Sequence, residues 1–262
     1  MVMTATAVVI ASLAVERSGP FIGGLIGALP AAAAPAYVIL ALDHPPDFVA
    51  ASAVGSVAIN CAVTIFATIY VLLAQRHGLL VSLGGAGIGW FAVAAALRLV
   101  AWTPLSAIAL NVVVYAVTIP LSRRFRGSTG PVSFVRTRLD IPLRALTVAL
   151  VVSVVTGASS RIGSFASGMF ALFPIILGSS IVIMHPRIGG KATASMLANV
   201  PVPLIGMALG FVAVHYLVAP IGVWPALAGG LLVSLAWSGL LLAVRLQQQK
   251  RRHAISSSPT AP

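Results

Sequence analysis

A short pattern of basic, aromatic, glycine and proline residues occurs twice in the chain. Each copy reads R-x-G-x-F-x-x-G-x5-P, and corresponding positions are 144 residues apart. Proline removes a backbone donor and interrupts a helix, while glycine lets another backbone or a solute approach closely. The free N–H groups at the start of a helix segment, together with its positive dipole end, suit an anion or a polar oxygen. The copies are Arg17, Gly19, Phe21, Gly24 and Pro30, and Arg161, Gly163, Phe165, Gly168 and Pro174.

Asparagine and histidine also occur within otherwise apolar stretches. After a slip of three residues, each copy of the pattern continues to a His-Pro pair and then to an asparagine, Asn60 or Asn199. Pro201 and Pro203 predict a helix break beside Asn199, and unwound backbone inside a membrane must be surrounded by protein or a water-filled cavity. An asparagine in a membrane helix either forms an interhelical hydrogen bond or contacts a ligand, and both interpretations stay open. Asn111 and His215 are further residues of this kind.

These residues predict a binding site for a small polar or anionic solute. The two arginines have a second interpretation, because a long basic side chain near a helix end can also extend to the lipid headgroups. The predicted substrate-binding residues are Arg17, Phe21, Gly24, Pro30, Asn60, Arg161, Phe165, Gly168, Pro174 and Asn199.

The composition places these residues in a membrane. Of the 262 residues 59% are hydrophobic and only 8% are charged, too few to cover the surface of a soluble domain of this length. The formal net charge of +12 reflects basic residues that gather in cytoplasmic loops, so nucleic acid is not an expected partner. A water-soluble enzyme is excluded.

Several kinds of chemistry lack the residues that they need. No aspartate or glutamate lies centrally in a predicted span, which disfavours ion-coupled antiport through a buried carboxylate. The sequence has neither a phosphate-binding loop of the G-x4-G-K-[ST] kind nor an HExxH motif, and Cys61 is its single cysteine. We therefore expect a protein that is not an enzyme and that needs no cofactor or metal.

Apolar segments separated by charges, glycines and prolines predict nine transmembrane helices. The segments are continuously apolar rather than alternating, which favours an all-α polytopic membrane helix bundle over a β-barrel. The predicted spans are 2–16, 19–42, 48–75, 78–101, 104–122, 142–158, 162–184, 191–217 and 220–245.

The repeated pattern divides the predicted spans into two groups of four with the fifth span between them. A single connecting helix inverts the second group relative to the first, which is the construction of many secondary transporters. The predicted units are a first repeat at 1–102, a connector helix and basic loop at 103–141, an inverted second repeat at 142–246 and a disordered basic tail at 247–262.

Two functions follow from this organisation. The first is a secondary transporter or facilitator working by alternating access around the broken second and seventh helices. The alternative is a non-transporting membrane scaffold or accessory subunit of an envelope complex. The expected partners are the lipid bilayer, the solute and a second copy of the chain in a homodimer.

The segment RIGSFASGMFALFPIILGSSIVIMHPRIGGKATASMLANVPVP resembles the GlpM-like family of small bacterial inner-membrane proteins. The resemblance covers roughly residues 145–215, and it extends more faintly over 4–60. Family members are single modules about half as long, so the chain is similar to a fused pair of modules. The resemblance implies a multi-pass protein of the bacterial inner membrane and no particular substrate.

The basic loop at 123–144 predicts the orientation of the chain, because arginine and lysine favour cytoplasmic loops. With nine spans, the N-terminus is then outside and the C-terminus is in the cytoplasm. A reporter fused after residue 252 is expected to be active in the cytoplasm, and one fused before Val2 is expected outside it. Both reporters on one side of the membrane would contradict the odd number of spans.

Overall fold

The computed structural model describes residues 20–29, 33–127 and 163–256, and these residues fold into helices joined by short turns. Six helical segments are long and apolar enough to cross a membrane, which confirms a multi-span helical membrane protein. The predicted spans 2–16 and 142–158 lie outside the described residues, as do Arg17, Pro30 and Arg161. The six segments are Pro46–Leu73, Leu79–Leu97, Pro104–Arg123, Gly163–Ile188, Gly190–Ile221 and Val223–Gln249.

Helix α4 (Pro46–Leu73) forms the centre of the bundle. It follows the extended residue Pro45, and Pro46 occupies the first helical turn, where a missing N–H costs no hydrogen bond. Most of α4 is buried, whereas α5 (Leu79–Leu97) is largely exposed. An apolar helix that other helices surround lies in the interior, and one exposed on most of its surface faces lipid.

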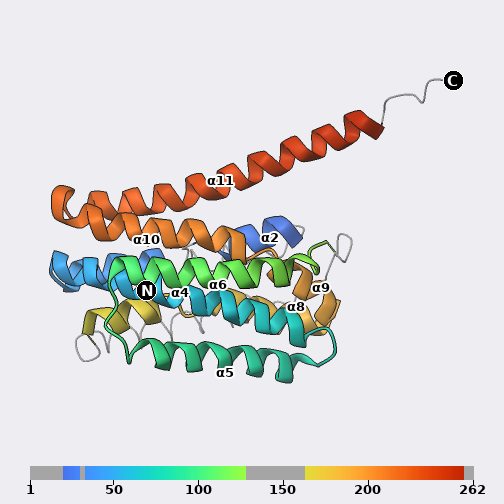
Figure 1. Cartoon of the computed structure of the whole chain (residues 1–262), viewed down its shortest axis with the longest axis horizontal. Coiled ribbons are helices and arrows are strands. Elements are labelled where there is room, and N and C mark those ends of the chain that lie inside the picture. Colours follow the sequence, from blue (N-terminus) through green and yellow to red (C-terminus); the bar gives the residue numbers. More distant parts are fainter. Residues whose placement is uncertain (1–19, 30–32, 128–162, 257–262) are drawn as a thin grey trace.

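The other long helices pack against α4 or, in one case, against a helix that covers it (Figure 1). Helix α6 (Pro104–Arg123) begins after Thr103, whose hydroxyl accepts a hydrogen bond from the Ser106 backbone N–H at 3.2 Å. Helices α10 (Pro201–Ile221) and α11 (Val223–Ser256) form an antiparallel pair, and α11 is mostly exposed.

The end of α11 differs from the sequence prediction. Residues 247–256 continue the helix, so the prediction of a disordered tail from residue 247 is wrong for this part. The stretch RLQQQKRR consists of residues with high helix propensity, which explains why the helix extends beyond its apolar portion.

Three of the predicted spans are interrupted. The second consists of α2 (Pro20–Gly27) and α3 (Ala33–Asp43). The seventh consists of a helix at 163–171 and α8 (Ile175–Ile188), with Pro174 immediately before α8. The eighth consists of α9 (Gly190–Leu197) and α10, which begins at Pro201. The interruptions that the prolines predicted at Pro174 and beside Asn199 are confirmed.

The helix at 163–171 crosses α4 with its backbone in direct contact. A Cβ atom added at Gly55 would overlap the Phe165 carbonyl, and one added at Gly168 would overlap the Ser52 carbonyl. Ser56 donates a hydrogen bond from its hydroxyl to the Gly168 carbonyl oxygen at 2.7 Å. Glycine on both helices is therefore what allows this crossing.

Among the described residues, the two acidic side chains lie at one end of the bundle, and most basic side chains other than Arg98 lie at the other. Asp47 lies in the first turn of α4, while Arg76 follows its last turn. Arg124 at the end of α6 and Lys191 at the start of α9 line the same cavity as Arg76. The basic end is the one that the sequence predicts to be cytoplasmic.

Replacing Gly168 by alanine tests the backbone crossing. The added methyl group meets the Ser52 carbonyl, so we expect a loss of about 1–3 kcal/mol in stability, as is typical of overpacking. Gly178→Ala in α8 is the matched control, because among the described residues no atom lies within 4 Å of its added Cβ. Thermal unfolding in detergent measures both variants, and equal stabilities would contradict the crossing.

Candidate functional site

A cluster of polar side chains lies at the middle of the bundle, between α4, α6 and α10. Asn60 is fully buried near the midpoint of α4. Its amide nitrogen donates to the Leu204 carbonyl oxygen at 3.1 Å and to the Tyr115 hydroxyl at 2.5 Å. The Asn111 side-chain oxygen lies 3.4 Å from the same nitrogen. Asn60 therefore links three helices.

Asn111 positions this cluster from α6. Its amide nitrogen donates to the carbonyl oxygens of Val57 at 2.6 Å and Ala107 at 2.9 Å. These bonds orient the Asn111 oxygen toward Asn60. Within the described residues, the side-chain oxygen of Asn60 is buried and has no hydrogen-bond partner, so one acceptor remains available at the centre of the bundle.

A small cavity lies beside the cluster, between the two interrupted helices. Its volume is about 40 Å³, enough for a water-sized molecule. Leu29 and Ala33 line it on the two sides of the interruption between α2 and α3, and Pro174 and Ile175 line it where α8 begins. Leu204, whose carbonyl accepts the bond from Asn60, also lines it. We call this space the central cavity.

The predicted site residues fall into several places. Gly24 packs against α9, and a Cβ added there would lie 2.8 Å from the Asn199 Cβ and 2.9 Å from the Met196 carbonyl oxygen. Asn199 donates to the Ser195 carbonyl of its own helix at 2.8 Å. Phe21 lies further out, with its ring centroid 4.0 Å from the guanidinium carbon of Arg245.

Only part of the predicted set therefore meets at the centre. Asn60 donates to the Leu204 carbonyl, and Leu204 and Pro174 both line the central cavity. Gly24 and Asn199 form a separate contact nearer the basic end. Gly168 and Phe165 form the contact with α4 nearer the opposite end.

Sequence reasoning missed the contributions of Tyr115, Tyr37 and Ser56. Tyr115 follows Asn111 by four residues on α6, a spacing that places both side chains on one helix face and that could have identified it. Tyr37 donates to the Ser56 hydroxyl at 2.7 Å, since the Ser56 proton is directed to the Gly168 carbonyl. No local signal marks this pair, because its partners come from three separate helices.

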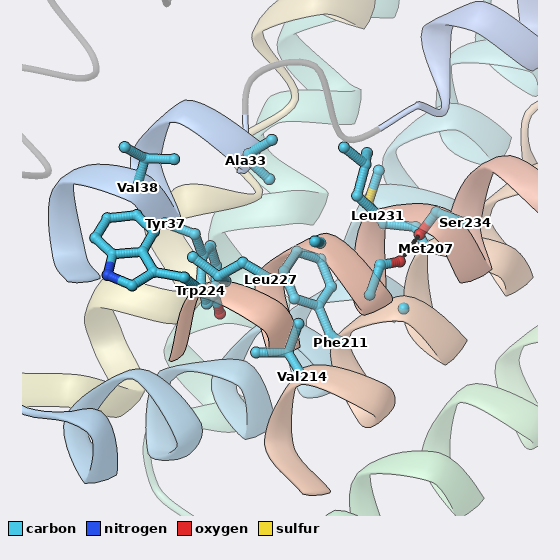
Figure 2. A pocket seen from close by; sticks show the side chains of 14 residues that line it. Ala33, Tyr37, Val38, Met207, Phe211, Val214, Trp224, Leu227, Leu231 and Ser234 are labelled. Atoms are coloured by element: carbon cyan, nitrogen blue, oxygen red, sulfur yellow. Dashed lines mark hydrogen bonds between the residues drawn. The ribbon is translucent and has the colours of Figure 1, made fainter. Parts of the chain in front are cut away.

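A larger cavity of about 260 Å³ lies between α3, α10 and α11 (Figure 2). Figure 2 shows Trp224 at one end, Ser234 at the other and Phe211 between them. The Ser234 hydroxyl donates to the Gly206 and Gly230 carbonyls at 3.1 Å, so its proton is already shared within the protein. The described lining is mostly apolar, and its Tyr37 and Ser234 hydroxyls are hydrogen-bonded within the protein, so the cavity suits a hydrocarbon chain.

The fold and the buried polar centre define a polytopic helical membrane protein. No family model, curated protein or solved structure matches the chain. The resemblance to the GlpM-like family therefore stays a prediction.

Replacing Asn60 by leucine tests the polar cluster. The substitution leaves the Leu204 carbonyl and the Asn111 oxygen without their donor, so we expect a loss of about 1–3 kcal/mol in stability. Thr118→Val is the control, because the Thr118 hydroxyl bonds only to Val114 of its own helix among the hydrogen bonds described. Unfolding by denaturant in detergent compares the variants, and an equal loss for both would show that the links between helices contribute nothing.

Proposed function

We propose that the chain is a secondary transporter or facilitator, which moves a small polar or anionic solute across the membrane by exchange between two inverted repeats. One observation carries the proposal. Gly24 contacts the carbonyl of Met196, and Gly168 contacts the carbonyl of Ser52. Gly168 follows Gly24 by 144 residues and Met196 follows Ser52 by 144, so each contact is the other with the two repeats exchanged. Such reciprocity is what a two-fold axis between repeats requires.

Helix boundaries support the same offset. Helix α4 begins at Pro46 and α9 at Gly190, 144 residues later, and α5 and α11 begin at Leu79 and Val223 with the same spacing. The offset also relates two contacts inside the repeats. A Cβ added at Gly85 meets the Leu73 side chain at 2.5 Å, and one added at Gly229 meets the Leu217 side chain at 3.2 Å.

The directions of the helices support inversion. In Figure 1, α4 runs toward the basic end of the bundle, whereas α9 and α10 run away from it. Helices α5 and α11 are likewise opposed, as are α2–α3 and 163–188. The corresponding elements of two parallel repeats would run the same way.

The proposed axis passes through the polar cluster. Asn60 donates to Leu204, which is its counterpart at an offset of 144. With this register Asn60 corresponds to Leu204 rather than to Asn199, and no slip of three residues is needed. Three pairs that line the central cavity have the same offset: Leu29 and Phe173, Ala33 and Leu177, and Val63 and Met207.

The ends of two helices favour a polar or anionic solute in the central cavity. Helix α8 begins at Ile175 and the described part of α3 begins at Ala33, and both residues line the cavity. Helix N-termini carry partial positive charge, and discontinuous helices that direct them to one point recognise anionic groups in transporters. All the described side chains that line the cavity are apolar, so the helix ends alone supply the preference for an anion.

The size of the cavity requires a movement of the repeats. A space of about 40 Å³ admits little more than water. The contact of Gly24 is with α9, which begins at the basic end, and the contact of Gly168 is with Ser52, near the opposite end of α4. Opening either contact in turn would expose the cavity to one side of the membrane at a time.

A disulfide across one contact tests the proposal. In a Cys61→Ala background, Gly24→Cys and Asn199→Cys place two thiols across the two repeats, with Cβ atoms close enough for a disulfide after a small shift. Proteoliposome swelling is measured with chloride, formate, phosphate and glycerol as probes. We expect at least a tenfold loss of flux on oxidation and recovery on reduction.

The control disulfide joins Gly210→Cys to Ser234→Cys, which are in contact within the second repeat. Its oxidation should leave the flux unchanged, because both residues belong to one proposed unit. Unchanged flux after oxidation of the pair at 24 and 199 would overturn alternating access. No protein-dependent flux of any of the four probes would favour the scaffold alternative.

A further inference from the structure

A polar cavity, separate from the central one, lies at the basic end of the bundle. It is formed by the C-terminal ends of α4 and α6 and by the start of α9. Its volume is about 650 Å³. We call it the basic pocket, and its lining residues are Leu72, Gln75, Arg76, Arg124, Phe125 and Lys191.

The described lining of the basic pocket carries three positive charges and no negative one. Arg76, Arg124 and Lys191 are exposed at its surface, and none of the described residues that line it is acidic. Asp43 and Asp47 lie at the opposite end of the bundle, where α3 ends and α4 begins. Three like charges around one cavity repel one another, and an anion between them relieves this repulsion.

Arg123 and Arg126 flank the lining residues Arg124 and Phe125 in the sequence, and they add to the positive field of the pocket. Arg126 donates from Nε to the Ala198 carbonyl at 2.9 Å, while its Nη2 is buried without a hydrogen-bond partner in the described part of the chain. Burial and, to a smaller extent, the neighbouring charge of Arg123 lower the pKa of Arg126.

The walls of the pocket are partly ordered before any ligand binds. The Arg124 guanidinium carbon lies 4.7 Å from the centroid of the Phe125 ring, a cation–π contact that limits its motion. Gln75 donates from Nε2 to the Val71 carbonyl at 2.8 Å. An arginine held in this way loses less conformational freedom when it binds an anion.

We propose that the basic pocket binds the phosphate of an anionic membrane lipid. Leu72 lies on the last turn of α4, so the pocket begins where the apolar span ends and its cations stand just beyond. An anionic phospholipid presents a phosphate at this depth with its acyl chains beside the apolar helices. Basic pockets between membrane helices on the cytoplasmic side are suited to such headgroups. This lipid site goes beyond the proposed transport and does not depend on it.

The bias of basic residues toward cytoplasmic loops explains their number but not this arrangement. Gln75 and Arg76, Arg124 and Lys191 belong to three segments that are distant in the sequence. Their convergence around one cavity, with Leu72 and Phe125 as apolar walls, is a property of the fold.

Lipid binding to the full chain in mixed micelles tests the site. Phosphatidylglycerol is titrated into protein in neutral detergent, with phosphatidylcholine as the uncharged reference, and bound lipid is counted by native mass spectrometry. Arg124→Gln is expected to weaken phosphatidylglycerol binding about fivefold, and Arg76→Gln with Arg124→Gln about 25-fold, from the effect typical of one basic residue near an anionic surface. Lysine at both positions should retain most of the affinity.

Arg98→Gln is the matched control, because it removes the same charge from an exposed position at the other end of α5. Its binding should equal that of the unmodified protein. An equal loss in Arg98→Gln and Arg124→Gln would overturn the pocket in favour of a diffuse charge effect. Inorganic phosphate that displaces the lipid at a similar concentration would overturn the lipid in favour of a soluble anion.

Discussion

The rest of the structure depends on one constraint, which is that unwound backbone inside a membrane must be covered by protein. The interruption beside Pro174 leaves peptide groups outside a regular helix, and lipid cannot satisfy them. Another backbone can approach closely only where a residue has no side chain, which requires glycine. Gly24 brings its helix into backbone contact with α9, and Gly168 brings its helix into backbone contact with α4. The close packing at these contacts explains why α4 lies at the centre and why small residues recur along it.

Helix α6 contributes to the polar cluster at the middle of the bundle. It supplies Asn111 and Tyr115, which hold the Asn60 amide so that it donates to the Leu204 carbonyl. The counterpart of Asn60 in the proposed repeat is a leucine, so the polar group at the centre comes from one half only. An exchange between halves would therefore not be energetically symmetric, and one of the two arrangements should be more populated.

The sequence predicted the elements of the fold better than their contacts. Long apolar runs are local signals, and they predicted the helices. Prolines are local signals too, and they predicted the interruptions at Pro174 and beside Asn199. Contacts between distant segments have no such signal, so neither the partner of Gly168 nor the role of Tyr115 could be predicted. In the proposed repeat Asn60 corresponds to Leu204 and not to Asn199, because the helix starts at Pro46 and Gly190 keep the offset of 144.

The distribution of charge gives the proposed pathway a direction. Positive helix ends at the central cavity, and arginine and lysine at the basic end, both favour anions and disfavour cations. The two fields differ in range, because salt screens exposed cations such as Arg76 beyond about 10 Å, while a buried helix end is screened much less. The attraction of anions to the basic end would thus depend on ionic strength. The selection of anions at the central cavity would not depend on it. A lipid phosphate in the basic pocket would cancel part of the first field and leave the second intact, so lipid composition would alter the rate of entry more than the choice of solute.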